Sequence, residues 1–368
     1  MKVINVVGAR PNFMKVAPIH KEMQRYPEFF QPLLLHTGQH YDERMSKFFF
    51  RDLGLPEPDA FLGVGSGSHA QQTAAVMVAF EQVCTRENPQ MAVVVGDVNS
   101  TLACSIVCAK LCIPVAHVEA GLRSFDRTMP EEINRIVTDS ISDLLFTTEE
   151  SGSRNLLKEG TPPEKIQFVG NVMIDSLRMF SRVSEGEKDI LQAYNLTHRS
   201  YAVVTLHRPS NVDDRNMLIG IAGILEAVQE KIPVLFPVHP RTSANLERLD
   251  ILTRLRSLPG LFMVEPLGYV EFTRLVKESA FVMTDSGGIQ EETTYFGVPC
   301  LTLRENTERP STVDIGTNHL VGTNQQEIVR CVDRIMKGEW KKGGIPPLWD
   351  GRASERIVDV LKGRMKSW

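Results

Sequence analysis

Short apolar runs alternate with longer amphipathic stretches along the whole chain. In the first half, the apolar runs predict strands at 2–7, 32–37, 91–97, 114–119, 143–148 and 165–170. The stretches between them carry apolar residues at helical spacing, near 14–26, 42–52, 70–86, 99–111, 131–142, 149–158 and 172–183. Strands that are apolar throughout and separated by helices are typical of a parallel sheet covered on both faces. We therefore predict a doubly wound α/β unit.

The second half repeats this pattern. Strands are predicted at 201–207, 234–239, 261–266, 281–286 and 298–303, with helices between them. A charged, glycine-containing stretch around 183–198 is the expected junction, so the predicted domains are 1–183 and 184–352. The fold class is thus α/β, with two doubly wound, Rossmann-like domains facing a cleft. Such a cleft is a common place for a ligand.

Composition narrows the class of protein. The chain has 368 residues, of which 42% are hydrophobic and 23% charged, as expected for a globular protein. The net charge of -4 argues against a surface that coats nucleic acid. No apolar run approaches the ~20 residues that span a bilayer, and the N-terminal MKVINVVGAR lacks a signal-peptide pattern. We expect no membrane insertion and a cytoplasmic location.

The six cysteines do not suggest a metal centre. Cys104, Cys108 and Cys112 follow one stripe of a predicted helix and lack the close CxxC pair of zinc sites. Buried free cysteine is common in protein cores. The other three, Cys84, Cys300 and Cys331, are scattered. No disulfide and no metal site are predicted.

Carboxylates mark the ends of two predicted strands. Glu119 directly follows an apolar strand, where a charged residue is seldom needed for packing, and Glu131 begins the helix after the intervening loop. Its neighbour Glu132 is expected to serve the helix start. Asp97 follows the third strand in the same way, and it either caps the next helix or lies level with Glu119. The carboxyl edge of the sheet is therefore a candidate for acid–base chemistry.

Several motifs predict an anion site. Arg10 and Lys15 follow the glycine turn after the first strand, although neither GxGxxG nor a Walker motif is present. His207 and His239 each precede an arginine or a Pro-Arg pair after a strand of the second half. A nearby cation, Arg309, follows in TERP.

The sharpest phosphate signal is the turn Ser286-Gly287-Gly288 between a strand and a helix. Its bare backbone N–H groups can approach an anion closely. Glu292 lies one helical turn further on and could reach a sugar diol. Together these motifs predict a nucleoside diphosphate with carboxylates at its far end. No nicotinamide fingerprint or metal-ligand set is visible, so the predicted chemistry is acid–base with no cofactor.

The motifs, taken in order, resemble those of the non-hydrolysing UDP-N-acetylglucosamine 2-epimerases. They are GARPNFMK, TGQH, GSGSHAQQT, GDVNSTLA, HVEAGLRS, MPEEINR, TLHR, TDSGGIQEE and TERP, and they span nearly the whole chain. The resemblance implies the glycosyltransferase-B architecture, with a last helix near 353–368 that completes the first domain. It implies interconversion of UDP-GlcNAc and UDP-ManNAc for cell-surface polysaccharide synthesis, without a cofactor, by a homodimer.

The resemblance also implies residue roles. The catalytic positions are matched by Asp97, Glu119, Glu131 and His207. The nucleotide-sugar contacts are matched by Arg10, Lys15, Phe272, Ser286, Gly287, Gly288, Glu292 and Arg309. Alternatives are a 2-epimerase of UDP-2,3-diacetamido-2,3-dideoxy-glucuronic acid, a hydrolysing epimerase or a glycosyltransferase of the same fold. A catalytically inactive sugar-nucleotide sensor would have no need of the three carboxylates.

One region departs from the family pattern. Regulated bacterial members bind a second UDP-GlcNAc through a segment resembling Gln-His-x-Gln and an HRREN loop. Here Gln39, His40 and His239 are the expected remnant of that second site. Asp42 brings a negative charge that would repel a diphosphate, and Pro209 replaces a cation of the loop. The sequence therefore predicts weakened regulation by a second sugar nucleotide.

Overall fold

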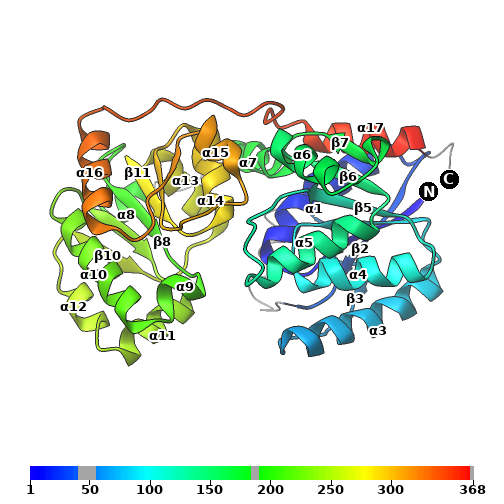
Figure 1. Ribbon diagram of the computed structural model, residues 1–368, viewed down its shortest axis with the longest axis horizontal. Helices are drawn as coiled ribbons and strands as arrows, with labels where there is room; N and C mark the ends of the chain where they lie inside the picture. Colours follow the sequence, from blue (N-terminus) through cyan, green and yellow to red (C-terminus); the bar gives the residue numbers. More distant parts are fainter. Residues whose placement is uncertain (40–54, 184–189, 365–368) are drawn as a thin grey trace. The chain divides into compact units, whose positions relative to one another are not determined.

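The computed structural model describes residues 1–39, 55–183 and 190–364, which form two compact units (Figure 1). The N-terminal unit comprises Met1–Met179 together with Pro347–Trp368, and the C-terminal unit comprises Phe180–Pro346. Each unit is built on its own sheet. No helix among the described residues is long and apolar enough to cross a membrane.

The N-terminal unit contains a seven-stranded sheet in the described residues, ordered β3-β2-β1-β4-β5-β6-β7. All its strand pairs are parallel. The strands are β1 (Lys2–Val7), β2 (Gln31–His36), β3 (Ala60–Phe61), β4 (Met91–Val95), β5 (Val115–Ala120), β6 (Leu144–Thr147) and β7 (Ile166–Phe168). The central strands β4 and β5 are buried along their whole length, as expected for a sheet with two covered faces.

Helices cover this sheet. They are α1 (Arg10–Gln24), α3 (His69–Glu87), α4 (Asn99–Lys110), α5 (Pro130–Ile141), α6 (Glu150–Lys158), the 3-10 helix η1 (Pro163–Lys165), α7 (Val172–Val183) and the C-terminal α17 (Ala353–Arg364). α3, α4 and α5 pack side by side, while α1 packs against α17. A capping box starts α3: Ser68 accepts a hydrogen bond from the backbone of Gln71, whose side chain reaches back.

The chain returns to the N-terminal unit through two buried polar anchors. The indole N–H of Trp349 donates to the Thr148 carbonyl over 3.0 Å. Asp175 of α7 accepts the backbone N–H groups of Ala353 and Ser354, at 3.1 and 2.8 Å, and so caps α17 from outside its own sequence. α17, red in Figure 1, is therefore part of this unit's core packing.

The C-terminal unit has a six-stranded parallel sheet in the described residues, ordered β10-β9-β8-β11-β12-β13. Its strands are β8 (Ala202–Thr205), β9 (Val234–Pro237), β10 (Leu261–Val264), β11 (Phe281–Thr284), β12 (Cys300–Thr302) and β13 (Asn318–Leu320). Its helices are α8 (Ile190–Ala193), α9 (Pro209–Val212), α10 (Arg215–Gln229), α11 (Pro240–Arg248), α12 (Leu252–Arg256), α13 (Tyr269–Glu278), α14 (Gly287–Phe296), α15 (Pro310–Asp314) and α16 (Gln325–Met336). α10 packs against α16, and α13 packs against both α8 and α14.

Strand order locates the crevice of each sheet. The order reverses between β1 and β4 in one unit and between β8 and β11 in the other. Ligands of doubly wound sheets bind at the carboxyl ends of the strands beside such a reversal. The segments that follow β1, β4 and β5, and those that follow β8 and β11, are therefore the places to look for chemistry.

The fold class expected from the sequence is confirmed, with two Rossmann-like parallel sheets. β3 and β13 were not predicted, because two or three residues at a sheet edge give too little periodicity to detect. α1 begins earlier than expected, at Arg10, since Pro11 suits the first turn of a helix. The predicted helix at 42–52 lies outside the described residues.

Candidate active site

Glu119 stands at an irregularity in β5. The pairing of β5 with β6 shifts register between Val118 and Ala120, so Glu119 is the extra residue of a bulge. Its φ of 76° is in the left-handed region, which a non-glycine residue adopts at a cost of roughly 1–2 kcal/mol. Bulges re-aim side chains, and strain of this kind often marks functional sites. The backbone thus turns the carboxylate out of the regular alternation of the strand.

A buried lysine meets this carboxylate. Lys15 of α1 forms an ion pair with Glu119, and both side chains are almost completely buried. Gly96, after β4, packs against the pair: a Cβ there would lie 3.2 Å from both Glu119 Oε2 and Lys15 Nζ. Its φ of 68° also requires glycine. Lys15 was expected at the diphosphate, and the structure places it beside the carboxylate.

Asp97 is held by a buried arginine. Arg135 of α5 donates through Nη1 to Asp97 Oδ2 over 2.5 Å. The neighbouring Asn134 donates to the Asp97 carbonyl over 2.8 Å. Asp97 itself is half-buried and does not cap α4, for which the N-cap is Val98. The helix-cap role that the sequence left open for Asp97 is therefore wrong. Its side chain instead contacts Arg135 of α5.

Glu132 organises the loop before α5, whereas the sequence suggested only a role at the helix start. Its carboxylate accepts the backbone N–H groups of Ser124 and Phe125, at 3.0 and 2.9 Å, and an ion pair from Arg135 at 2.7 Å. Burial alone would raise the pKa of Glu132, but these donors outweigh it and the pKa is lowered. Glu132 is therefore a fixed anion that holds both the loop and Arg135.

Glu131 differs from the other two candidate catalytic carboxylates. It lies in the first turn of α5 and is half-buried. Among the described residues it forms no hydrogen bond or ion pair. α5 therefore carries one carboxylate locked into structure, Glu132, and one that faces no cation, Glu131.

A second buried network supports the carbonyl next to Asp97. His117, in the middle of β5, contacts Asp139 through Nδ1 at 2.7 Å and the Gly96 carbonyl through Nε2 at 2.9 Å. Asp139 also accepts the Gly121 N–H at 3.0 Å and pairs with Arg123 at 2.7 Å. Asp139 and the Gly96 carbonyl thus fix both sides of the imidazole ring. Buried polar contacts therefore support the turn that carries Asp97.

In the C-terminal unit, His207 is oriented by a buried aspartate. The Nδ1 atom of His207 lies 3.0 Å from Asp285 Oδ1. Asp285 also accepts the backbone N–H groups of His207 and Arg208 and the amide of Asn211. Burial would raise the pKa of Asp285, but His207 and these donors lower it. Because Asp285 engages Nδ1, the His207 Nε2 atom is left for other chemistry.

The turn after β11 forms an anion cradle. Ser286 is the N-cap of α14, and Gly287 and Gly288 open the helix. Arg309 lies so close that a Cβ on Gly287 would be 2.7 Å from its Nη1 atom. Nothing lies within 4 Å of the corresponding position on Gly288. The helix N-terminus thus presents bare backbone N–H groups beside a guanidinium, which suits a phosphate.

Three arginines surround one buried glutamate next to this cradle. Glu308 is contacted by Arg304 at 2.8 Å, Arg309 at 3.0 Å and Arg208 at 3.5 Å. Burial would raise the pKa of Glu308, but the three cations hold it well below its usual range. Arg309 also pairs with Glu291 at 2.6 Å. This cluster brings three guanidinium groups and two carboxylates together beside the start of α14.

Glu292 and Phe272 lie further along the same unit. Glu292 is buried, and the Tyr269 hydroxyl donates to its Oε1 over 3.1 Å. Phe272 lies one helical turn after Tyr269 on α13 and packs partly buried against the core. Tyr269 therefore positions a carboxylate on α14, the helix that carries the anion cradle.

The residues expected at a second site belong to both units or lie outside the described residues. The Gln39 Oε1 atom accepts the backbone N–H of Ser100 at 3.0 Å and its hydroxyl at 2.7 Å, so Gln39 serves the start of α4. His40 lies outside the described residues. His239 is the exposed N-cap of α11, with its ring centroid 6.1 Å from that of His207. Arg10 is the first residue of α1.

Sequence reasoning did not predict several residues that hold the candidate site. They are Arg135, His117, Asp139, Asp285, Arg304 and Glu308. One signal was available, because Glu132 and Arg135 have the i, i+3 spacing of a helical ion pair. Except for Arg304 and Glu308, which are four residues apart, the other contacts join residues far apart in the chain, which no local pattern reveals.

The two units bring together different chemical groups. The N-terminal unit gathers carboxylates at the ends of β4 and β5 and the start of α5, suited to proton transfer. The C-terminal unit presents a helix N-terminus beside arginine side chains and an aspartate-oriented histidine, suited to a diphosphate. Neither set contains a nicotinamide fingerprint.

Known proteins of one family resemble this chain over nearly its whole length. The profile of the family described as UDP-N-acetylglucosamine 2-epimerase matches residues 21–362. A UDP-N-acetylglucosamine 2-epimerase of Methanocaldococcus jannaschii is 41% identical over 98% of this chain and 99% of its own. A UDP-2,3-diacetamido-2,3-dideoxy-D-glucuronate 2-epimerase of Pseudomonas aeruginosa is 39% identical over 98% of this chain and 99% of its own. The crystal structure of a M. jannaschii UDP-GlcNAc 2-epimerase in complex with UDP-GlcNAc and UDP superposes with a TM-score of 0.90, at 41% identity, covering 99% of this chain and 100% of the other. The chain belongs to the UDP-N-acetylglucosamine 2-epimerase family.

Proposed function

We propose that this protein is an isomerase that reversibly inverts C2 of UDP-GlcNAc to give UDP-ManNAc. The observation that carries the proposal is the set of carboxylates Asp97, Glu119 and Glu131 at the sheet reversal of the N-terminal unit. The anion cradle at Ser286 of the C-terminal unit supplies the complementary chemistry.

The reaction requires activation of C2. A sugar C2–H is too weak an acid for a carboxylate, so the C1–O bond to UDP breaks first and leaves oxocarbenium character at C1. The adjacent C2 proton is then acidic enough to pass to a carboxylate, which gives a 2-acetamidoglucal and UDP. Protonation of C2 from the opposite face and return of UDP to C1 complete the epimerisation. No net oxidation occurs.

The residues divide these tasks. The start of α14 and Arg309 stabilise the departing diphosphate, a contribution of a few kcal/mol per donor. The three carboxylates of the N-terminal unit serve the two faces of the ring as acid and base. His207, with Nδ1 engaged by Asp285, offers Nε2 to the diphosphate or to the proton that accompanies its release.

The comparisons favour UDP-GlcNAc as the substrate. The family description and the M. jannaschii relative both carry that name. The relative named for the diacetamido-glucuronate sugar is 39% identical, so that sugar is the appropriate competing substrate in an assay.

The test is an NMR time course in deuterium oxide with either sugar nucleotide as the sole substrate. We expect UDP-GlcNAc to give UDP-ManNAc with deuterium at C2, without an acceptor and with or without EDTA. Release of free ManNAc would indicate a hydrolysing enzyme. Products without deuterium at C2, or turnover of the diacetamido-glucuronate sugar alone, would contradict the proposal.

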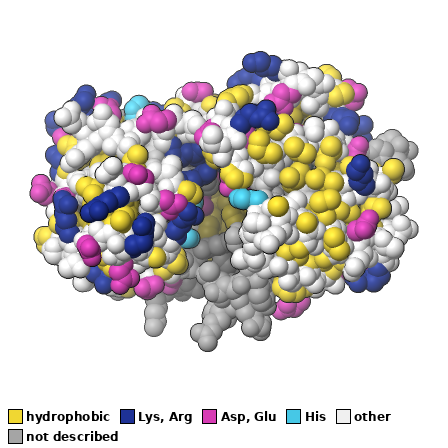
Figure 2. All heavy atoms as spheres, turned by 60° about the horizontal axis from the view of Figure 1, so that its bottom comes forward, with side chains coloured by type: hydrophobic (Ala, Val, Ile, Leu, Met, Phe, Trp, Pro, Cys, Tyr) yellow, Lys and Arg dark blue, Asp and Glu magenta, His cyan; other side chains and the backbone are white. Residues whose placement is uncertain are grey.

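We also propose that the protein acts as a homodimer through an apolar face of the N-terminal unit. Figure 2 shows apolar side chains gathered on one face of this unit. Partly or fully exposed apolar residues on the outer sides of α3 and α4, here called the α3–α4 surface, are Ala74, Met77, Val78, Leu102, Ile106 and Leu111. Contiguous apolar surface of this kind usually marks an interface.

Sedimentation of single variants tests this surface. Val78 is 62% exposed, so a V78E substitution should leave the fold intact and place a charge in the interface. We expect wild type to sediment as a dimer and V78E as a monomer. A matched control, L157E, changes a residue that is 49% exposed on α6 and should stay dimeric. A monomeric wild type, or a dimeric V78E, would contradict the proposal.

A further inference from the structure

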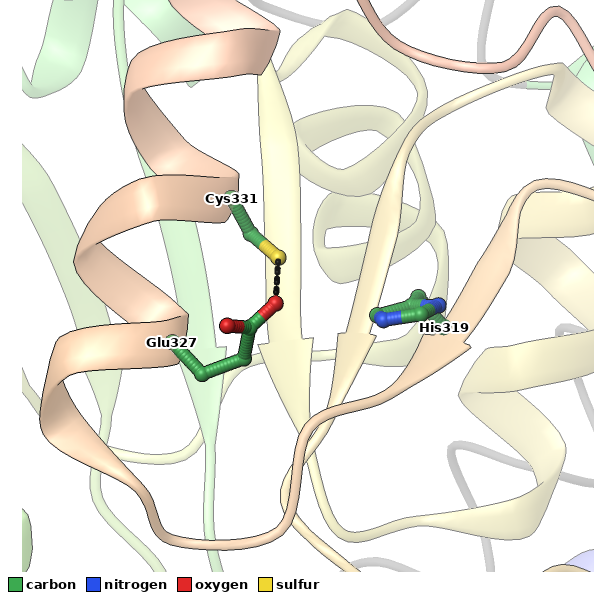
Figure 3. A group of neighbouring side chains, drawn as sticks. All are labelled: His319, Glu327 and Cys331. Atoms are coloured by element: carbon green, nitrogen blue, oxygen red, sulfur yellow. Dashed lines mark hydrogen bonds between the residues drawn. The ribbon is translucent and has the colours of Figure 1, made fainter.

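A histidine, a glutamate and a cysteine converge on the C-terminal unit away from the groups assigned to the substrate. His319 lies on β13, and Glu327 and Cys331 lie on α16 (Figure 3). Their ligand atoms all lie within 4.8 Å of one another. The Cys331 thiol donates to Glu327 Oε1 over 3.6 Å. The three side chains point toward a common space between the helix and the edge strand.

The helix holds its two members in fixed relation. Glu327 and Cys331 are four residues apart and so share one face of α16. Asn324 caps the helix by accepting the Glu327 backbone N–H at 3.1 Å. A salt bridge of 2.7 Å between Lys231 and Asp333 joins α16 to the segment after α10. Cys331 is buried in the core, so its side chain has little freedom to move.

The third member, His319, is exposed but positioned. Its ring meets that of Trp340 edge-on, with centroids 5.8 Å apart and an interplanar angle of 90°. Trp340 is itself fixed, because its indole N–H donates to the Thr317 carbonyl over 3.1 Å. Trp340 therefore keeps the imidazole near α16 and restricts the range over which it can rotate.

We propose that His319, Glu327 and Cys331 bind a divalent zinc-class cation. Thiolate, imidazole and carboxylate are the ligand types that zinc takes in proteins, and the exposed side of His319 leaves room for water as a fourth ligand. Zinc bond lengths of about 2.0–2.3 Å in a tetrahedron bring ligand atoms to roughly 3.5 Å from one another. The Cys331–Glu327 separation already meets this value, and the surface imidazole closes the remaining distance by a side-chain rotation.

Binding replaces the thiol proton of Cys331 with the metal. The Cys331 S–H bond breaks, a zinc–sulfur bond forms, and one proton leaves to solvent, with no change of oxidation state. Glu327 binds through the oxygen that now accepts the thiol, since Oε2 faces Arg330 at 3.3 Å. Arg334 and Lys341 also act electrostatically on His319. These cations make the binding of a second metal ion unfavourable. The charge of a single divalent ion is offset by its two anionic ligands, the Glu327 carboxylate and the Cys331 thiolate.

The consequence is a link between β13 and α16. β13 is the edge of the C-terminal sheet in the described residues, joined on one side to β12. A bound cation would tie this short strand to a helix that already packs against α10. None of the three ligands belongs to the residues assigned to catalysis, so the role is stabilisation of the unit and not a step of the reaction.

Titration of tag-free, metal-stripped full-length protein with Zn²⁺ and with Co²⁺ tests the proposal. We expect one ion per chain, a thiolate-to-cobalt charge-transfer band, and a rise in Tm with added Zn²⁺. H319A changes an exposed side chain and should fold normally, yet it should weaken Zn²⁺ binding at least about tenfold. C331S should abolish the cobalt–thiolate band.

Two controls separate this site from incidental binding. C112S removes a cysteine exposed on the N-terminal unit, and H198A removes an exposed histidine that already faces a carboxylate, Glu278. Both should bind like wild type. Absence of binding to wild type, loss of the cobalt band in C112S but not in C331S, or unchanged affinity in H319A would each overturn the proposal.

Discussion

The three carboxylates of the N-terminal unit have different surroundings, which bears on how they can act. Glu119 meets Lys15, and Asp97 meets Arg135, in both cases with a cation that is almost fully buried. Glu131 meets no such partner among the described residues. Glu131 can therefore exchange a proton without breaking an ion pair, whereas each of the other two must do so against a fixed cation.

Amide substitutions should separate catalysis from stability at these positions. D97N, E119Q and E131Q should each lower kcat by ~10²–10⁴, the usual range for general acid–base groups, while UDP binding is retained. D97N and E119Q should also lower Tm, because D97N removes one of the two carboxylates that hold Arg135 and E119Q removes the carboxylate paired with the buried Lys15. E131Q should leave Tm unchanged. Kinetics, calorimetry with UDP and thermal unfolding measure the three effects, and wild-type turnover by all three variants would place the chemistry elsewhere.

The orientation of His207 depends on a buried aspartate. Asp285 fixes the Nδ1 side of its ring over 3.0 Å, so D285N should disturb the tautomer and orientation of His207 without removing the imidazole. We expect kcat to fall at least tenfold, with a smaller change in KM. Nitrogen-15 NMR of the imidazole should show altered protonation of Nδ1 in the variant. A drop in kcat with an unchanged histidine spectrum would show that Asp285 acts only by holding the backbone.

At the scale of elements, the candidate catalytic carboxylate of β5 lies at a β-bulge, a local irregularity of the strand. The bulge at Glu119 rotates the carboxylate toward Lys15 at the price of a left-handed backbone. This strain is compensated by the buried neighbours β4 and β6. The strained position of this candidate catalytic carboxylate is therefore held in place by the rest of the sheet.

This strain can be measured by comparing two inactive variants. E119G and E119A both remove the carboxylate and leave Lys15 unpaired in the same way, so these effects cancel. Because the position has φ of 76°, E119G should be more stable than E119A by about 1 kcal/mol. Elsewhere in a strand glycine is the less stable of the two. Equal free energies of unfolding, or a more stable E119A, would show that the bulge stores no strain.

The arginine cluster around Glu308 gives the C-terminal unit an acid-sensitive element. Its pKa lies below the unfolded value of about 4.3, so between these two pH values the unfolded state binds more protons. The resulting stabilisation is complete above about pH 4.3 and is lost as the pH falls through the folded pKa. E308Q lacks this contribution and should unfold more readily at neutral pH.

Denaturant unfolding at neutral pH and near pH 3 tests whether the ionised Glu308 carboxylate stabilises the folded state. The stability gap between wild type and E308Q should narrow on acidification, because below about pH 4.3 the unfolded wild type takes up a proton at Glu308 while the folded state keeps this carboxylate ionised. An exposed control, E150Q on α6, should follow wild type at both values. A gap that stays constant or widens in acid would contradict a stabilising role for the charge of Glu308.

Local patterns in the sequence account for the long elements and for the residues at their ends. Glu119, Asp97 and the Ser286 turn stand out because each directly follows an apolar strand. The bulge at Glu119 was not predictable, since it arises from pairing with β6. The Asp285–His207 and Glu308–Arg208 contacts were also beyond reach, because they join residues 78 and 100 positions apart.

At the scale of the whole molecule, both units use the same topological device for different chemistry. The reversal beside β1 and β4 places carboxylates, and the reversal beside β8 and β11 places a phosphate-type cradle. A duplicated architecture therefore supplies acid–base groups from one copy and anion binding from the other. Regulation by a second sugar nucleotide would need further groups, and these are where the chain departs from its regulated relatives.

We predict that the enzyme needs no activation by UDP-GlcNAc. Gln39 is already engaged by Ser100, with its side-chain oxygen accepting at 2.7 and 3.0 Å. Pro209 begins α9 where the regulated loop carries a cation, and proline offers no backbone N–H. Asp42 lies outside the described residues, but its charge is unfavourable for a second diphosphate wherever it comes close.

The experiment starts the reaction from UDP-ManNAc alone, with all UDP-GlcNAc removed enzymatically beforehand. An unregulated enzyme should begin at its full initial rate, with no lag. A trace of UDP-GlcNAc should change nothing, because no second site waits to be filled before the first turnover. A stall from UDP-ManNAc that a trace of UDP-GlcNAc relieves would show that the second site is intact, and that His239 and its neighbours still hold a regulatory ligand despite Pro209.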